Sequence, residues 1–370
     1  MHQTFMRKPV FIFLILLFWI PDLLSYSLVE QKSPKKKERP PRNIILMIGD
    51  GMGVAQLYAG YTARCEQLNI AQFSVCGLVK TNSNDNYITD SGAAATALAT
   101  GHKTNNGYIS VGPNGDTLET ILQKAEKKGL ATGLVATSAI THATPAGFIA
   151  HSINRGNTEE IALGFLKTDV DVFIGGGYSH FTQRKDSLNL IDSLVSRGYF
   201  VARDLRDVDV PTVSKLAALL ADGHLPRASA GRGEMLPEAS SMAVKLLKRN
   251  KKGFFLMIEG SQIDWGGHDN NLDYIIEEVV DFDKAVGKML EFARKDKETL
   301  VIVTADHETG GLGLIGGDLK AGKIEAGFIH QEHTGVFVPI FTYGPGAFHF
   351  TGIMDNTDIN KRCLKLLNLK

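Results

Sequence analysis

The sequence predicts an α/β protein built on a large, mostly parallel β-sheet with helices on both faces. Two observations lead to this fold class. Apolar runs without alternation, such as residues 43–48 and 254–258, are typical of strands that are buried on both faces. Helical patterns separate these runs along the chain, which favours parallel strands joined by crossover helices.

Each predicted element has a local signal. The strand at residues 43–48 is followed by a glycine. The helix predicted over 117–128 is amphipathic and is closed by Gly129, whereas the helix over 237–249 carries proline in its first turn. The other helices are predicted over 54–68, 91–100 and 272–295, and the other strands over 131–137, 171–174, 300–304 and 336–343. Residues 178–236 are less regular, and we expect them to form an excursion from the sheet.

The composition excludes several classes of protein. The 370 residues include 40 basic and 40 acidic side chains, so the strongly basic surface of a dedicated nucleic-acid binder is excluded. With 44% hydrophobic and 22% charged residues, the chain is globular rather than intrinsically disordered. Three cysteines exclude a disulfide scaffold, and they leave open whether Cys65 and Cys76 pair.

The N-terminal segment predicts export. Arg7 and Lys8 precede an apolar run over residues 10–20, which is too short to span a membrane. We therefore interpret residues 1–27 as a secretory signal peptide, with an uncleaved membrane anchor as the alternative. Residues 28–42 are basic and contain prolines, as expected of a linker, and the catalytic domain is predicted over 43–370. The expected location is secreted or periplasmic, with no stable membrane span after cleavage.

Polar side chains follow the predicted strands. In open α/β sheets, ligands bind beyond the carboxyl ends of the strands, so these residues are the candidates for a functional site. The candidates are Asp50, Thr144, Glu259, Asp264, His268, Asp306, His307 and His333.

Each of these residues has a structural explanation when it is taken alone, but their convergence does not. Acids and imidazoles gathered at one sheet edge would be costly to bury unless cations were bound among them. Imidazole with carboxylate suits zinc, and all-oxygen ligation suits magnesium. Two metals in one site are able to clamp both oxygens of an in-line displacement.

Ser91 is the candidate nucleophile. It stands at the start of the Ala-rich helix, where backbone amides favour an anion. The alternative is that Ser91 or Asp90 serves only as the helix N-cap. Capping by one of them leaves the other free, and a bound zinc ion is able to activate a serine hydroxyl without a histidine base.

From Asn43 to about Leu366 the sequence resembles the alkaline phosphatases, in particular the metal-dependent, secreted bacterial type. The resemblance is carried by six ordered segments: NIILMIGDGMG, TDSGAAATALATG, THATPAGFIAHSINR, FFLMIEGSQIDWGGHDNN, VIVTADHETGG and QEHTG. It implies a three-layer α/β/α sandwich, hydrolysis of phosphate monoesters through a phosphoserine, and a homodimer. It also implies two zinc ions and one magnesium ion.

The resemblance assigns a role to each candidate. Ser91 matches the position of the family's nucleophile. Arg155 matches the arginine that grips two phosphate oxygens. One zinc would be held by Asp264, His268 and His333, and the other by Asp50, Asp306 and His307. The third metal would be held by Asp50, Thr144 and Glu259. A surface ion pair is the structural alternative for Arg155.

Two positions depart from part of the family. His142 stands where some members have aspartate, so its imidazole would favour zinc nearby or hold a water. Trp265 stands where some members have lysine, so an apolar wall would replace a cationic contact to substrate. Two alternative functions stay open: a phosphodiesterase of the same superfamily, and a secreted metal-binding protein without catalysis. Arg155 argues against the first, because a diester offers one fewer charged oxygen.

Overall fold

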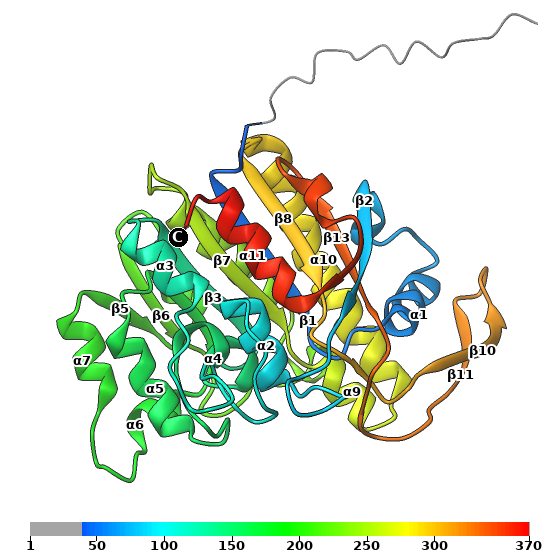
Figure 1. Cartoon of the computed structure of the whole chain (residues 1–370), viewed down its shortest axis with the longest axis horizontal. Coiled ribbons are helices and arrows are strands. Elements are labelled where there is room, and N and C mark those ends of the chain that lie inside the picture. The colour runs from blue at the N-terminus through cyan, green and yellow to red at the C-terminus, as the bar shows by residue number, and fades with distance from the viewer. Residues whose placement is uncertain (1–38, 370) are drawn as a thin grey trace, which may run out of the picture. The chain divides into compact units, whose positions relative to one another are not determined.

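A ten-stranded β-sheet forms the centre of the computed structural model, which describes residues 39–369 (Figure 1). Only β13 runs antiparallel to its neighbours, β2 and β8; every other neighbouring pair is parallel. In sheet order the strands are β14 (Gly352–Asp355), β2 (Val75–Lys80), β13 (Val338–Tyr343), β8 (Thr299–Thr304), β1 (Asn43–Gly49), β7 (Phe254–Gly260), β3 (Ala131–Ala139), β4 (Val172–Gly176), β6 (Lys215–Leu219) and β5 (Tyr199–Ala202). The mostly parallel sheet confirms the predicted fold class.

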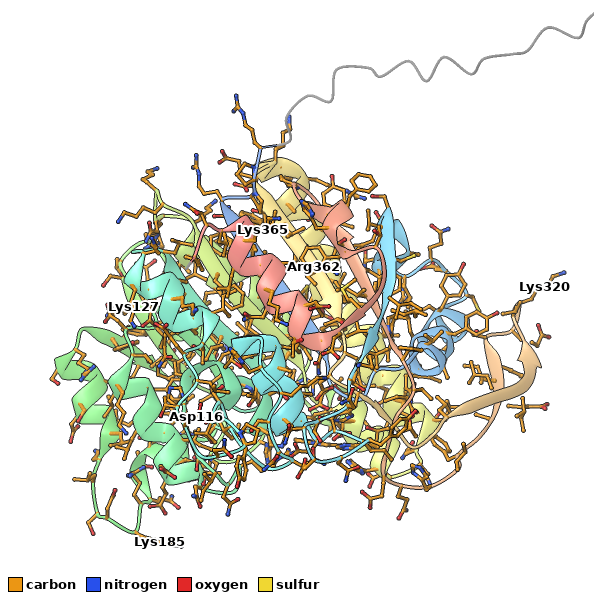
Figure 2. The ribbon with its side chains drawn as sticks, viewed as in Figure 1. Asp116, Lys127, Lys185, Lys320, Arg362 and Lys365 are labelled. Carbon is orange, nitrogen blue, oxygen red and sulfur yellow. The ribbon has the colours of Figure 1, made fainter. Side chains whose placement is uncertain are left out.

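Helices cover both faces of this sheet. Figure 1 shows α2, α3 and α11 in front of the strands and α10 behind β8 and β13. The main helices are α1 (Val54–Arg64), α2 (Ser91–Thr100), α3 (Ile121–Lys127), α4 (Ala143–Ile149), α5 (Thr158–Lys167), α8 (Met235–Leu247), α9 (Ile263–His268), α10 (Leu272–Asp296) and α11 (Asn356–Leu366). The central strands are buried on both sides, which explains their unbroken apolar sequences. Charged side chains such as Lys127, Lys185 and Lys320 point outward (Figure 2).

The prediction for residues 178–236 is wrong. This region does not leave the sheet, because it contributes β6 and β5 to its edge. It also forms two short helices, α6 (Tyr178–Thr182) and α7 (Leu190–Ser196). The two strands are only five and four residues long, so their apolar signal is weak in the sequence.

Helix boundaries differ from the predictions where capping geometry decides them. The helix predicted to reach residue 68 ends at Arg64, because Cys65 adopts a left-handed conformation. The helix predicted from residue 117 begins at Ile121, because Thr120 and Gln123 form a capping box. The predictions also omit β2, β14, the hairpin of β10 (Gly313–Asp318) and β11 (Lys323–Gly327), and α11, although a capping box of Asp355 and Asp358 starts α11.

The predictions about the N-terminus, membrane spans and cysteines are tested to different extents by the structure. The predicted signal peptide and most of the predicted linker lie outside the described residues. None of the helices within residues 39–369 is long and apolar enough to cross a membrane. Cys65, Cys76 and Cys363 all carry free thiols, so Cys65 and Cys76 are not paired.

Candidate active site

The candidate residues gather at the carboxyl ends of four neighbouring strands. The strands β8, β1, β7 and β3 are adjacent in the sheet, and Asp50 and Asp306 follow β1 and β8 directly. Glu259 lies near the end of β7, in register with Ile48 of β1. Neighbouring strands lie about 4.8 Å apart, so residues that are distant in sequence become neighbours here.

Asp264, His268 and His333 form the first group of potential metal ligands. One ligand atom from each lies within 4.8 Å of the others. The Nε2 atom of His268 is 3.3 Å from Oδ2 of Asp264, and Nε2 of His333 is 3.5 Å from Oδ1. Helix α9 presents Asp264 and His268 on one face, because residues four apart lie one turn above each other.

Hydrogen bonds outside the first group orient its imidazoles. Nδ1 of His333 donates to the carbonyl oxygen of Thr89 at 2.9 Å, and Nδ1 of His268 donates to the carbonyl oxygen of Gln331. A ring that donates through Nδ1 keeps its Nε2 lone pair available for a metal. Both Nε2 atoms face Asp264, so the donors of the first group fit a metal ion such as zinc.

Asp50, Asp306 and His307 form the second group, and Ser91 lies beside it. Nε2 of His307 is 3.2 Å from Oδ2 of Asp306 and 3.5 Å from Oδ1 of Asp50. The hydroxyl oxygen of Ser91 is 3.3 Å from the same Nε2. All four residues are buried, so the hydroxyl meets the group away from bulk water.

Asp50, His142 and Glu259 form the third group, and Thr144 lies nearby on α4. Oε1 of Glu259, Oγ1 of Thr144 and both carboxylate oxygens of Asp50 are buried without a hydrogen-bond partner among the described residues. Unpartnered buried oxygens are costly unless a cation satisfies them. The oxygen atoms of Asp50, Thr144 and Glu259 therefore fit a hard cation such as magnesium.

The pKa values of the acids show the same need for cations. Burial, and then the neighbouring Asp306, raise the pKa of Asp50 well above its ordinary value. Burial raises the pKa of Glu259 to about 7, and burial with the charge of Asp264 raises that of Asp306 to about 6. Cations would relieve this repulsion and keep the acids ionised.

The first group differs, because its imidazoles already balance its carboxylate. Burial opposes ionisation of Asp264, but the hydrogen bond from His268 and the charges of nearby imidazoles hold its pKa well below the ordinary range. The same hydrogen bond raises the pKa of His268 to about 9. In contrast, burial and the neighbouring His333 lower the pKa of His307 well below its ordinary value.

Arg155 reaches the site from the loop after α4. One guanidinium nitrogen lies 2.8 Å from Oδ2 of Asp90, and another lies 3.4 Å from Nε2 of His142. The other carboxylate oxygen of Asp90 accepts from the backbone N–H of Ala93 at 2.9 Å, which makes Asp90 the N-cap of α2. Asp90 thus connects the helix that carries Ser91 to the guanidinium, and the ion pair of Arg155 lies within the site.

Known proteins are similar to this chain in sequence and in fold. The sequence profile of the alkaline phosphatases matches residues 41–320. The chain is 36% identical to alkaline phosphatase 4 of Bacillus subtilis, with 91% of each protein covered. It is 32% identical to the alkaline phosphatase of Escherichia coli, with 90% of this chain and 87% of that protein covered. The chain belongs to the alkaline phosphatase family.

Solved structures of the alkaline phosphatase family agree with this assignment. The alkaline phosphatase of the Antarctic bacterium TAB5 is 40% identical and superposes with a TM-score of 0.87, covering 90% of this chain and all of that one. The fold class, the family and the assignment as an enzyme, all predicted from sequence, are confirmed.

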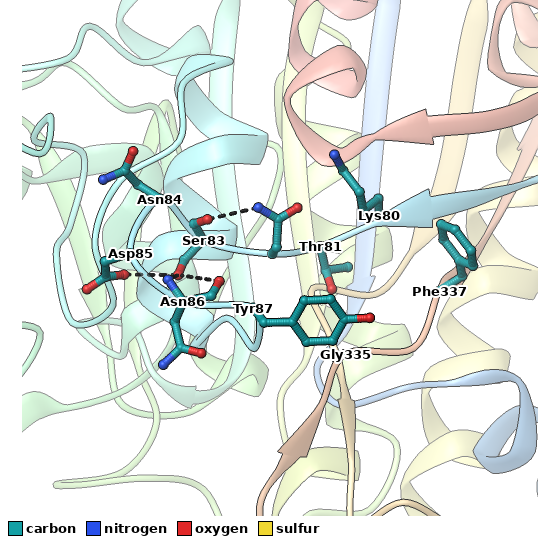
Figure 3. Close-up of a pocket in the computed structure, with 10 residues that line it drawn as sticks. Lys80, Thr81, Ser83, Asn84, Asp85, Asn86, Tyr87, Gly335 and Phe337 are labelled. Carbon is teal, nitrogen blue, oxygen red and sulfur yellow. Dashed lines mark hydrogen bonds between the residues drawn. The ribbon is translucent and has the colours of Figure 1, made fainter.

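A cavity of about 470 Å³ lies beside the loop that leads into Ser91 (Figure 3). Its walls include the loop residues 81–87 and, from the segment after His333, Gly335 and Phe337. The ring of Tyr87 lies so close to Gly335 that a side chain at Gly335 would displace it. Tyr87 therefore links the loop before the candidate nucleophile to the segment that carries His333.

Sequence reasoning missed two residues that touch predicted residues of the site. The hydroxyl of Thr309 donates to Oδ1 of Asp264 and lies 3.3 Å from Nδ1 of His307, so it connects the first and second groups. His224 packs against His142 and Trp265. Thr309 follows the DHE segment directly, which was an available signal, whereas His224 lies in the region that showed no regular pattern.

Proposed function

We propose that this enzyme hydrolyses phosphate monoesters at alkaline pH through a phosphoserine intermediate on Ser91. Two zinc ions would occupy the first and second groups, and one magnesium ion the third. The observation that carries the proposal is the position of Ser91, whose buried hydroxyl stands at the N-terminus of α2 and 3.3 Å from His307 of the second group. When bound, the cations supply Lewis-acid stabilisation of the entering and leaving oxygens.

The residues of the chain position the reacting atoms for two successive displacements at phosphorus. Ser91 Oγ loses its proton to solvent and bonds to phosphorus, and the bond to the ester oxygen breaks, so that the alcohol leaves with a proton. Water then attacks phosphorus, and the bond to Ser91 Oγ breaks to release inorganic phosphate. The positive end of the α2 dipole favours the negative charge that gathers next to Ser91 throughout.

Arg155 would hold the transferred phosphoryl group. Its contact with Asp90 fixes the guanidinium, and a planar guanidinium is suited to grip two non-bridging oxygens. A monoester dianion offers those two charged oxygens, whereas a diester offers one. The proposed grip of Arg155 on two charged oxygens supports a monoesterase over a phosphodiesterase. The position of Ser91 supports an enzyme over a protein that only binds metals.

His142 and Trp265 would shape the substrate side of the third group. Burial, and then the charge of Arg155, lower the pKa of His142 to about 3, so its ring is neutral in the physiological range. A neutral imidazole beside oxygen donors favours zinc more than an aspartate would. Structures of His-to-Asp and His-to-Glu variants of the TAB5 enzyme hold magnesium in a site called M3. The oxygens of Asp50, Thr144 and Glu259 favour magnesium instead, and we propose magnesium for the third group. Counting zinc and magnesium in the wild type and in His142→Asp tests this assignment: magnesium in both supports it, and zinc in the wild type contradicts it.

The central test compares Ser91→Ala with Arg155→Ala on a matched monoester and diester. Ser91→Ala should remove the phosphoenzyme and most turnover while phosphate still binds. Arg155→Ala should lower kcat/KM for the monoester by about 10- to 150-fold, the range for losing one charge-assisted contact, and lower it much less for the diester. Arg64→Ala, which removes an exposed arginine of α1, is the control. An equal loss on both substrates after Arg155→Ala would contradict the clamp.

The pH profile is a second test. Ser91 must lose its proton before it attacks, so turnover at saturating monoester should rise from neutral to alkaline pH. An acid optimum with a steady decline above neutrality would contradict the mechanism. Export through residues 1–27, the secreted or periplasmic location and the homodimer stay predictions.

A further inference from the structure

The imidazole of His142 is shared between two parts of the site. Its Nε2 lies 3.4 Å from Arg155, and its Nδ1 is buried without a hydrogen-bond partner among the described residues. One of its nitrogens lies within 4.8 Å of ligand atoms of Asp50 and Glu259. Since only one long contact restrains the nitrogens, the orientation of the ring depends on what packs against it.

Two other rings pack against His142. His224 meets it edge to face with centroids 5.5 Å apart, and Trp265 does so at 6.2 Å. His224 and Trp265 also meet edge to face, at 4.9 Å. These distances and angles are those of favourable aromatic pairs. In this closed triangle, turning the His142 ring would break two contacts at once.

His224 is itself fixed by a backbone hydrogen bond. Its Nδ1 accepts from the N–H of Ala139 at 3.0 Å, so the neutral ring carries its proton on Nε2. His224 is also absent from the potential metal groups formed by the described residues. Its influence on the third group therefore passes through His142.

The segment that carries His224 is hydrogen-bonded to the residues that follow β4. The N–H groups of Gly177 and Tyr178 donate to the carbonyl oxygens of Gly223 and Ala221, at 2.7 and 3.0 Å. A side chain at Gly176 would collide with the Gly223 oxygen, so glycine is required for this close approach.

The residue after His224 is held as well. The carbonyl oxygen of Leu225 accepts from the side-chain amide of Gln262 at 2.9 Å, and the same amide donates to the carbonyl oxygen of Thr137. These contacts hold His224, which is exposed to solvent, beside the ring of His142 at the third group.

We propose that His224 is a positioning residue that holds the His142 ring toward Asp50 and Glu259 and so sets the affinity of the third cation. The inference rests on the proposed third position but not on turnover. Loss of the ring should weaken the third cation and leave the two zinc ions in place. Residues that orient metal-binding groups typically change metal affinity by about 10- to 100-fold when they are substituted.

Four variants of the full chain separate the ring from its hydrogen bond. His224→Phe keeps a ring without the acceptor, His224→Asn keeps an acceptor without the ring, and His224→Ala removes both. His180→Ala is the matched control. The Nδ1 of His180 is hydrogen-bonded to Oγ1 of Thr141, next to His142, but the ring of His180 lies outside the triangle. Equilibrium dialysis with zinc and magnesium, followed by elemental analysis, gives the cations bound per chain.

We expect His224→Ala and His224→Asn to bind the third cation about 10- to 100-fold more weakly, with His224→Phe and His180→Ala close to wild type. Wild-type affinity in His224→Ala overturns the proposal, and so does an equal loss in His180→Ala. Loss in the Phe variant with retention in the Asn variant also overturns it, because the hydrogen bond rather than the ring would then matter.

Tryptophan fluorescence gives a readout that needs neither metal nor substrate. The chain has two tryptophans, so Trp19→Phe leaves Trp265 as the only one. In that background His224→Ala should shift the Trp265 emission to longer wavelength, His224→Phe should restore it, and His180→Ala should not move it. An unchanged emission in His224→Ala overturns the ring contact. A chain that showed these shifts but hydrolysed no monoester would refute the proposed function and leave this inference standing.

Discussion

The first and third groups belong to the same site, yet different forces hold their side chains. In the first group, His268 and His333 each donate through Nδ1 to a backbone carbonyl oxygen, so their Nε2 atoms already face Asp264. At the third group, the hydroxyl oxygen of Thr144 and one oxygen of Glu259 have no hydrogen-bond partner among residues 39–369. The first group is therefore organised by the protein, whereas the third group would need a cation to satisfy its oxygens.

The charge balance differs in the same way. Imidazoles beside Asp264 compensate its charge and hold its pKa well below the ordinary range, even though burial opposes this. At Glu259, the hydrogen bond from Ser261 offsets only part of the burial, which raises the pKa of this carboxyl to about 7. The comparison predicts that one site contains both a preorganised position and a position that a cation would complete, and four experiments test it.

Removal of all metal should have the largest effect. A chelator should reduce turnover to the uncatalysed background, because the second and third groups carry acids that repel each other without cations. Zinc followed by magnesium should restore turnover, with zinc bound more tightly because the first group is already oriented. Full activity in a preparation shown to be metal-free by elemental analysis would contradict the expectation.

Gly51→Ala should have the next largest effect. Gly51 has a φ of +72°, and a Cβ there would lie 2.6 Å from Cα of Asp264, so both strain and collision would displace the first group. The strain alone costs about 1–2 kcal/mol. We expect loss of bound zinc and of most turnover, measured by elemental analysis and kcat.

The matched control is Gly335→Ala. It also collides with a side chain, but Tyr87 is 78% exposed and is free to swing aside. Near wild-type zinc content is expected for this variant. Equal losses in the two variants would show that collision near the site, rather than displacement of Asp264, causes the defect.

Thr309→Val should cause a smaller loss that involves both zinc positions. Its hydroxyl connects Asp264 with His307, and outer hydrogen-bond partners of metal ligands are typically worth about 10- to 100-fold in metal affinity or activity. Thr144→Val should instead weaken only the third cation. Competition with a metal indicator measures each affinity, and zinc binding that is equally weak in both variants would remove the distinction between the groups.

The pH dependence of stability should show the smallest effect. The folded-state pKa of Glu259 is raised from an ordinary 4.5 to about 7, so the metal-free folded chain binds this proton more tightly than the unfolded chain. Its contribution to stability is therefore fully present below about pH 4.5 and lost as pH rises through 7, on the order of 3 kcal/mol.

Thermal unfolding of the metal-free chain should accordingly give a lower Tm at pH 7.5 than at pH 5.5. Glu259→Gln should flatten this slope, and bound cations should raise the Tm most at the higher pH. A slope that Glu259→Gln leaves unchanged would assign the effect to Asp50 or Asp306 instead.

Much of the site was predictable because its residues follow strands. Asp50 and Asp306 come directly after apolar runs, and the carboxyl ends of parallel strands meet at one edge. The structure gathers all eight predicted ligands into three groups or their immediate neighbourhood, and it places Ser91 and Arg155 beside them. Their roles as ligands, nucleophile and clamp remain proposals.

The unpredicted features come from contacts between distant segments. The edge strands β5 and β6 are too short for a period to be visible, and they form because neighbouring strands offer unpaired backbone groups. His224 is 85 residues from Ala139, its hydrogen-bond donor, and Thr309 is 45 residues from Asp264. No local pattern encodes such pairs.

The sequence by itself determined the α/β class, the alkaline phosphatase family and the identity of the candidate ligands, because apolar runs and the motifs after them are local properties of the chain. The tertiary structure decided which imidazole nitrogen faces Asp264, which oxygens of Glu259 and Thr144 lack partners among the described residues, and which rings pack against His142. These depend on burial and on hydrogen bonds across the sheet, which exist only once distant segments have packed together.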